Sequence, residues 1–210
     1  VVLTHPQEDH LGGLQEVVKR YEVKNFVHSD VGNATQGFET LMRTVKEKHI
    51  PERIVGTGEK ITVGSTLVSV VWPASSFLAE KKSSNVLGVS NVNDASVILK
   101  VSYGSFDALF TGDADSHVDG DLTKVPLFDF DGIEVLKVPH HGSKTGMTEG
   151  FFQWLGPINL AVISVGKNTY GHPAPETITR LEKDGAQVLR TDKEGNIEIV
   201  SDGRMWSVKR

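Results

Sequence analysis

A short polar segment near the start of the chain, His5-Pro6-Gln7-Glu8-Asp9-His10, constrains the fold and the chemistry more than any other feature. It follows residues 1–4, whose composition is typical of the end of a buried strand, and it precedes Gly12-Gly13. Imidazole nitrogens and carboxylate oxygens this close together are suitable ligands for Zn²⁺, Mn²⁺ or Fe, whereas the amide of Gln7 offers only a weakly binding oxygen. The pattern therefore favours a metal site.

The backbone of this segment decides how its side chains meet. On an extended chain His5, Gln7 and Asp9 point to one side, and a turn at Asp9 lets His10 join them. The alternative is an ordinary helix N-terminus, with Asp9 as its cap and solvated histidines.

Composition excludes several other kinds of site. The chain has 210 residues, enough for one α/β domain, and no cysteine, which excludes disulfides, thiolate nucleophiles and cysteine zinc sites. A formal charge of −5 and a pI near 5.9 argue against a broad basic surface for nucleic acid. They do not exclude a polyanionic substrate, because a bound metal adds positive charge that the count omits.

No apolar run approaches the ~20 residues of a membrane span, so we expect no transmembrane segment in this chain.

A second polar element follows the apolar run that ends in Thr111-Gly112-Asp113. A carboxylate at the end of a strand can bridge two divalent ions that lie about 3.5–4 Å apart. Alone this signal is weak, because strand-Gly-Asp turns are common. Asp115 and His117 are expected to be exposed turn residues.

The third element is the histidine pair His140-His141 at the end of an apolar strand, followed by Gly142-Ser143-Lys144. Adjacent side chains point opposite ways along a strand, so one histidine can bind a metal while the other faces substrate or an outer partner. Ser143 and Lys144 are candidate contacts for an anionic oxygen. The alternative is a pair of surface histidines.

The fourth element is a glycine-bounded loop, Val165–Pro173, that carries His172 just before a predicted helix. This histidine is a candidate metal ligand, a proton donor to a leaving group or a phosphate contact. An ordinary loop histidine is an equally good interpretation of the loop alone.

Hydrophobic periodicity indicates an α/β chain in which strands and helices alternate in the second half. Residues 73–92 are expected to form a loop. Helices are predicted after Gly13, through Tyr21, and at Phe38–His49, Thr148–Trp154 and Glu176–Lys183. Strands are predicted at Asn25–His28, Ile61–Val63, Thr66–Trp72, Ala95–Ser102, Phe106–Thr111, Ile133–Val138, Leu160–Val165, Gln187–Arg190, Asn196–Val200 and Met205–Val208.

Taken in order, the four motifs resemble those of the metallo-β-lactamase superfamily, and within it the hydrolase domain of the ComEC/Rec2 competence proteins and their free-standing relatives. The resemblance spans nearly the whole chain, from Val2 to the last strand. It implies an α/β fold of the αββα type, a four-layer sandwich of two mixed sheets flanked by helices, with the metals at one edge between the sheets. The family carries a strand pair ahead of the first motif, so we expect residues 1–210 to be a single domain that lacks its first strands.

The resemblance also implies roles for individual residues. It implies two divalent ions at most, Mn²⁺ or Zn²⁺, with Asp113 bound between them. Of the histidine pair, it leads us to expect that His140 binds a metal and that His141 contacts a residue outside the metal site or the substrate. The expected metal ligands are His5, Gln7, Asp9, His10, Asp113 and His140. The expected catalytic residues are Asp9, Asp113, His141 and His172, and the expected substrate contacts are Asn93, Ser96, Ser143 and Lys144.

Two departures from the family pattern weaken the first metal site. The family usually has histidine or aspartate where this chain has Gln7, and residues 91–96, which normally supply another histidine, contain none. The first ion is therefore expected to be bound by Asn93 or Asp94, loosely held or absent. A ligand set rich in carboxylates shifts the preference from Zn²⁺ towards Mn²⁺.

The function implied by the resemblance is phosphodiester hydrolysis, as a nuclease on DNA in a ComEC-like role, through a metal-activated hydroxide. Single-stranded DNA and a membrane-channel portion of the same parent protein are the expected partners. Such a domain would be extracytoplasmic, and a free-standing one cytoplasmic or secreted. The alternatives are hydrolysis of another ester, as in phosphocholine esterases or lactonases, and a non-catalytic, metal-stabilised domain that binds DNA or a partner. A true β-lactamase is the least favoured.

Overall fold

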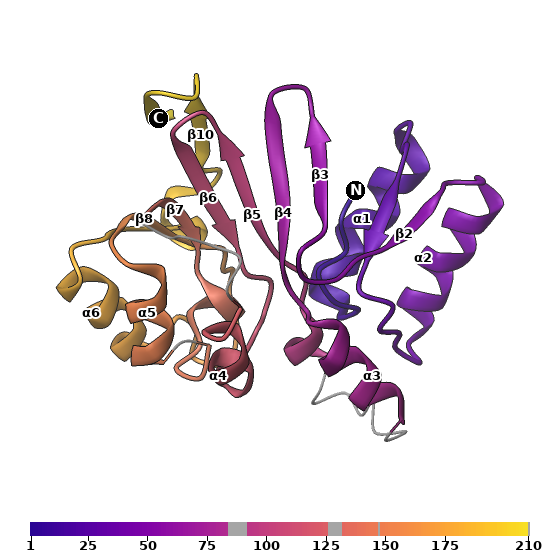
Figure 1. The fold of residues 1–210 in the computed structure, drawn as a ribbon, viewed down its shortest axis with the longest axis horizontal. Helices are drawn as coiled ribbons and strands as arrows, with labels where there is room; N and C mark the ends of the chain where they lie inside the picture. Colours follow the sequence, from indigo (N-terminus) through magenta and orange to yellow (C-terminus); the bar gives the residue numbers. More distant parts are fainter. Residues whose placement is uncertain (84–91, 126–131, 147, 210) are drawn as a thin grey trace.

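The computed structural model describes all residues except 84–91, 126–131, 147 and 210 (Figure 1). Its helices are α1 (Glu8–Arg20), α2 (Gln36–Glu47), α3 (Ser75–Ser83), α4 (Asp119–Leu122), α5 (Glu149–Leu155), α6 (Pro175–Lys183) and α7 (Thr191–Glu194). Its strands are β1 (Phe26–His28), β2 (Glu52–Ile54), β3 (Lys60–Val63), β4 (Thr66–Trp72), β5 (Ile98–Tyr103), β6 (Phe106–Phe110), β7 (Ile133–Lys137), β8 (Ile158–Ile163), β9 (Gln187–Arg190), β10 (Glu198–Ser201) and β11 (Trp206–Lys209).

A seven-stranded mixed sheet in the order β3-β4-β5-β6-β7-β8-β9 forms the centre of the molecule (Figure 1). Neighbours from β3 to β6 are antiparallel, whereas β6, β7, β8 and β9 run parallel. The carboxyl ends of parallel strands meet at one edge of a sheet, where ligands bind in many open α/β folds. The motifs that follow β6, β7 and β8 therefore emerge side by side.

A second, smaller layer lies against the first half of this sheet. Strands β1 and β2 pair in parallel, and Val2 adds a bridge to Val27. Phe26 packs with residues of α1 and α2, whereas Val27 packs with Val70 and Leu99 of the large sheet. Neighbouring side chains on a strand point to opposite faces, so β1 joins the helices on one side to the sheet on the other.

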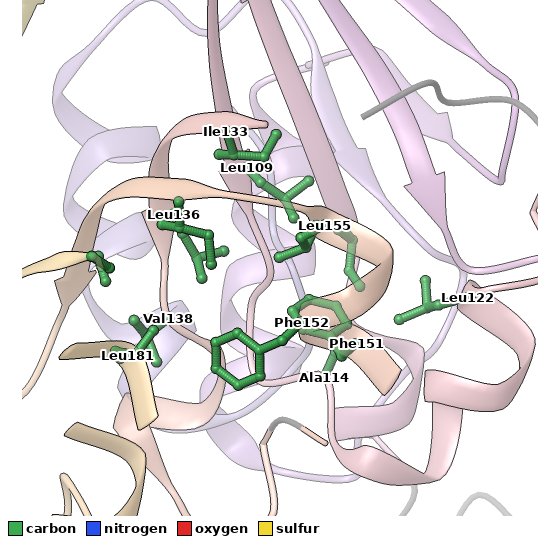
Figure 2. Packing of buried hydrophobic residues seen from close by; sticks show 14 of the residues in the cluster. Leu109, Ala114, Leu122, Ile133, Leu136, Val138, Phe151, Phe152, Leu155 and Leu181 are labelled. Atoms are coloured by element: carbon green, nitrogen blue, oxygen red, sulfur yellow. The ribbon is translucent and has the colours of Figure 1, made fainter. Parts of the chain in front are cut away.

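The main core lies between the large sheet and the helices of the second half (Figure 2). Phe151 and Leu155 of α5 and Leu181 of α6 pack against Leu109 and Leu136 of the sheet. Burying each such side chain contributes about 1.5–3 kcal/mol. The hairpin β10–β11 covers part of the other face (Figure 1). Across the molecule the layers are helices, the small β layer, the large sheet and a second set of helices. This order confirms the predicted αββα fold class.

Sequence periodicity missed some elements. The loop expected at residues 73–92 is wrong over Ser75–Ser83, which form α3; its apolar residues have no helical period, so the pattern gave no signal. Residues 84–91 of that expected loop lie outside the described part of the chain. Strand β2 was also missed, because Glu52–Ile54 carries two charges and has no buried face. None of the helices in the described ranges is long and apolar enough to cross a membrane.

Candidate metal centre

Three strand ends and the first turn of a helix converge on one polar cluster. Thr4, at the end of the first extended segment, accepts a hydrogen bond from the Val97 amide, 2.8 Å away. The chain then enters α1 at Glu8, so Asp9 and His10 lie in the first helical turn rather than on an extended loop. Asp113 follows β6 and the histidine pair follows β7. A helix N-terminus is thus present, as in the alternative, but its N-cap is Gln7 rather than Asp9, and its first turn carries two residues of the cluster.

The cluster consists of Asp9, His10, Asp113 and His141, whose ligand atoms all lie within 4.8 Å of one another. His10 Nε2 is 3.2 Å from Asp113 Oδ1. His141 Nε2 is 3.2 Å from Asp113 Oδ2 and 3.2 Å from Asp9 Oδ2. The Nε2 atoms of His10 and His141 face each other at 3.4 Å. Two imidazoles and two carboxylates aimed at one point form a donor set that fits a divalent ion such as Zn²⁺ or Mn²⁺.

The main chain holds the His141 ring in the orientation that a ligand needs. His141 Nδ1 is 2.7 Å from the carbonyl oxygen of Ser164, at the end of β8. A carbonyl only accepts, so Nδ1 carries a proton and donates it, and Nε2 is the nitrogen that faces the cluster. Histidines that bind metals usually have such an outer partner on the second nitrogen.

A left-handed turn sets the direction of the two adjacent histidines. The φ angles of His140, His141 and Gly142 are 45°, 53° and 78°. This conformation costs roughly 1–2 kcal/mol for each residue with a Cβ, and such strain is concentrated at functional sites. A Cβ on Gly142 would lie 2.6 Å from Cβ of Pro173, so glycine is required there.

The two histidines consequently have different surroundings. His141 enters the cluster, whereas His140 Nδ1 lies 3.6 Å from Asp115 Oδ2 and its ring is 5.5 Å from that of His172. Sequence interpretation favoured His140 as the ligand, and this placement leads us to propose His141 in its stead. The exposed position expected for Asp115 is wrong, because its side chain is only 15% exposed.

Asp113 is the most deeply buried acid of the cluster, with a side chain that is 1% exposed. Burial acts to raise the pKa of this carboxyl, but hydrogen bonds from His10 and His141 and the charge of Lys137 together hold it well below its usual value. Lys137 Nζ donates to the Gly112 carbonyl at 2.7 Å and lies 3.5 Å from Asp113 Oδ1. A buried carboxylate needs such compensation to remain ionised.

The turn before Asp113 leaves no room for a side chain. Gly112 has φ +55°, and a Cβ there would lie 2.9 Å from Ser96 Cβ and 3.1 Å from Thr4 Cβ. Ser96 is fully buried, and its Oγ accepts a hydrogen bond of 3.1 Å from the Asp113 amide. Sequence interpretation made Ser96 a substrate contact, but it lies beneath Asp113, where it positions the backbone.

The residues expected at the first metal site are arranged differently. His5 Nε2 lies 3.3 Å from Gln7 Oε1, and His5 Nδ1 lies 3.2 Å from Thr4 Oγ1. Burial, with a contribution from His10, lowers the pKa of His5 to about 4, so the ring is neutral at pH 7. Both of its nitrogens thus have partners within the chain. Asn93 Oδ1, one of the ligands expected there in place of a histidine, is buried without a hydrogen-bond partner among the described residues, and the weak or empty first site stays a prediction.

Other predicted site residues lie around this cluster rather than in it. Ser143 is buried, and its Oγ is 3.1 Å from Thr145 Oγ1. Lys144 is exposed on the same turn. His172 lines a cavity that Asp9, Asp113 and His141 of the cluster also line, and burial lowers its pKa. Of the expected substrate contacts, therefore, Asn93 lines this cavity, Lys144 is on the surface, and Ser143 supports the turn.

Two adjoining cavities open beside the cluster. One, of about 470 Å³, is lined by Gln7, Asn93, Asp113 and His140 among others. The other, of about 440 Å³, extends along the loop after β8. Both are also lined by Asp9, His141, Tyr170 and His172. The cluster therefore has space for a substrate on the side of the β8–α6 loop.

Comparison with known families agrees with this geometry. The family model described as the metallo-beta-lactamase superfamily matches residues 1–151. The chain belongs to that superfamily. Solved structures with a similar fold include CmlA, a diiron beta-hydroxylase from Streptomyces venezuelae, with a TM-score of 0.53 at 12% identity, over 91% of this chain and 43% of that one. At this identity the likeness concerns the fold alone.

The most informative relatives by sequence are competence and recombination proteins. ComE operon protein 3 of Bacillus subtilis is 29% identical over 94% of this chain, and Recombination protein 2 of Haemophilus influenzae is 23% identical over 95%. Competence protein ComA of Neisseria gonorrhoeae is 33% identical over 51% of the chain. The matched regions are 24%, 22% and 15% of those proteins, so the chain spans a quarter of their length or less.

Metal binding is expected to release a proton from His141. Hydrogen bonds to Asp113 and then to Asp9 raise the pKa of His141 to about 10, so its ring is protonated at pH 7 in the absence of metal. A metal binds only the neutral imidazole, and about one proton should leave for each ion bound. Calorimetric titration with Mn²⁺ at pH 7, in two buffers of different ionisation enthalpy, measures this number.

The pH dependence follows from the same pKa. Because the folded pKa of His141 is raised, its contribution to the stability of the metal-free protein is complete below the unfolded value of 6.5 and is lost as pH rises through about 10. Metal affinity should therefore increase with pH over that range. An observed enthalpy that is the same in both buffers, or an affinity that is flat with pH, would contradict the prediction.

Proposed function

We propose that this chain is a metal-dependent phosphodiesterase that cuts DNA, in a role like that of the ComEC-type competence proteins. The observation that carries the proposal is the convergence of Asp9, His10, Asp113 and His141 beside an open cavity. The names of the relatives, which refer to competence and recombination, support DNA as the substrate. Their greater length supports a parent protein in which residues 1–210 form one domain, and we propose that another part of that protein forms a membrane channel.

The donor set indicates which ion the cluster would hold. Two imidazole nitrogens and two carboxylates suit Zn²⁺ or Mn²⁺, and we propose His10, His141, Asp9 and Asp113 as the ligands. When bound, a divalent ion supplies positive charge for the phosphate oxygens and an activated water at neutral pH.

The protein's own residues complete the reaction on the cavity side. Asp9, whose side chain is 58% exposed, orients the attacking water and takes its proton. The water oxygen forms a bond to phosphorus as the bond from phosphorus to the ester oxygen breaks. His172, which lines the same cavity, donates a hydrogen bond from its ring N–H to the departing oxygen, and that oxygen takes its proton from solvent.

Hydrolysis assays test this proposal directly. Purified protein loaded with Mn²⁺ or Zn²⁺ should hydrolyse bis-p-nitrophenyl phosphate and single-stranded DNA, and excess EDTA should stop both reactions. Protein that is folded and contains metal but cleaves neither substrate would refute the phosphodiesterase. Parallel assays with p-nitrophenyl phosphorylcholine, a lactone and nitrocefin test the esterase, lactonase and β-lactamase alternatives.

One observation favours a second candidate, a metal-stabilised domain that binds DNA or a partner without cutting. His5 and Gln7 are bonded to each other rather than aimed at the cluster, so a mechanism that requires two ions would lack its first site. DNA binding with one ion per chain and no hydrolysis would support this candidate.

A further inference from the structure

The loop between β8 and α6 presents an exposed aromatic ring beside the metal cluster. The side chain of Tyr170 is among the most exposed large hydrophobic groups of the described residues, at 82%. Its ring stacks on that of His172, with centroids 6.0 Å apart and planes 19° from parallel. Single exposed aromatic residues are ordinary on protein surfaces, so exposure alone does not indicate a binding role for Tyr170. The residues around its ring provide that evidence.

Asn168 fixes the backbone that carries the ring. Its Nδ2 donates to the carbonyl oxygens of Gly166 (3.0 Å) and His172 (2.8 Å). Its Oδ1 accepts from the amides of Tyr170 and His172, each at 3.1 Å. These four bonds use all the donors and acceptors that a side-chain amide normally has. The loop is therefore held in place before any ligand binds, which lowers the entropy cost of binding.

The stacked pair lies where a substrate would leave the metal cluster. Tyr170 and His172 line both adjoining cavities, which also share Asp9 and His141. The cavity along the loop is lined in addition by Lys167, which offers a cation. A planar apolar face next to a cation is complementary to a nucleotide, since it offers contacts for both a base and a phosphate.

We propose that Tyr170, supported by His172, is a platform on which a nucleobase next to the scissile phosphodiester stacks. This inference rests on the proposed function and specifies its substrate. Stacking needs a free base face, and in a duplex both faces of an internal base are covered by neighbouring bases. The platform therefore selects a single-stranded or unpaired stretch, and it does so with little sequence preference because every base has an aromatic face.

Equilibrium binding tests the platform without requiring hydrolysis. The probes are fluorescein-labelled hexathymidylate and a matching strand in which every base is replaced by an abasic tetrahydrofuran unit. Fluorescence anisotropy in EDTA gives the ratio of their dissociation constants, in which effects of the shared phosphates cancel. The wild-type protein should bind the strand with bases about 10-fold more tightly, and Tyr170→Ala should bring the ratio close to one.

Two variants serve as controls. Tyr170→Trp retains a stacking face and should keep the wild-type ratio. Tyr21→Ala removes another exposed tyrosine (67%), which caps the end of α1, and should also leave the ratio unchanged. The proposal is overturned if the wild-type ratio of dissociation constants is near one, or if Tyr170→Ala leaves that ratio unaltered. A preserved ratio in protein that never hydrolyses DNA supports the platform and refutes only the proposed function.

Discussion

An Asp113→Asn variant is expected to lose metal-dependent phosphodiester hydrolysis by about 10³-fold or more. Asp113 contributes the buried carboxylate that faces both His10 and His141, and asparagine keeps its shape but not its charge. Loss of several kcal/mol of charge stabilisation in a metal site, at about 1.4 kcal/mol for each factor of ten, gives this magnitude. The measurement is the initial rate with bis-p-nitrophenyl phosphate at saturating Mn²⁺, with metal content determined on the same protein.

A surface aspartate supplies the matched control for this variant. Asp121→Asn removes an acid whose side chain is 56% exposed and whose partner is Lys124, 2.9 Å away. It should retain wild-type activity and metal content. Circular dichroism of both variants establishes that they are folded. Wild-type activity in Asp113→Asn would exclude the cluster as the reaction centre.

The broad arrangement of the site could be predicted from the order of the motifs and their family resemblance, and chain topology gives the physical reason for it. Asp113 and His141 lie just after neighbouring parallel strands, whose ends must meet at one edge of the sheet. Apolar runs marked those strands in the sequence, and the resemblance to a known family led to the expectation that the polar residues after them share one site. The fold class followed from the same alternation of strands and helices.

The choice between His140 and His141 could not be made from the pattern. An extended strand and a left-handed turn send successive side chains in different directions, and the sequence signal for such a turn was only Gly142. The φ angles of the two histidines, 45° and 53°, are unusual for residues with a Cβ. The outer partner of His141 is a main-chain carbonyl, that of Ser164, which no residue-type pattern can identify.

Lys137 was also overlooked, although a signal for it existed. A lysine within an apolar strand, Ile133–Lys137, is rarely buried unless it has a partner. Asp113 is that partner, but it lies on the turn after the neighbouring strand, and the pairing register that brings the two together is a property of the folded sheet. The sequence alone thus indicated the need for a buried acid but not its identity.

Replacing Lys137 by methionine should destabilise the metal-free protein by about 3 kcal/mol, the lower end of the range for breaking a buried ion pair. Methionine fills similar volume, but the buried carboxylate of Asp113 then depends on His10 and His141 alone. The Gly112 carbonyl keeps a backbone partner, the His140 amide at 3.3 Å. Urea unfolding in EDTA measures the change in the free energy of unfolding. Lys124→Met, at a surface pair with Asp121, should change it by less than ~0.5 kcal/mol.

Divalent metal should reduce the destabilisation caused by Lys137→Met, because the ion provides the positive charge that the lysine no longer supplies to Asp113. By thermodynamic linkage, any reduction must appear as tighter metal binding by the variant, at about 1.4 kcal/mol for each factor of ten. Unfolding curves with and without Mn²⁺ and a direct metal titration thus measure one quantity by two routes. If the loss is equal with and without metal, Lys137 acts only on the turn at Gly112, and the lysine and the ion do not share the charge of Asp113.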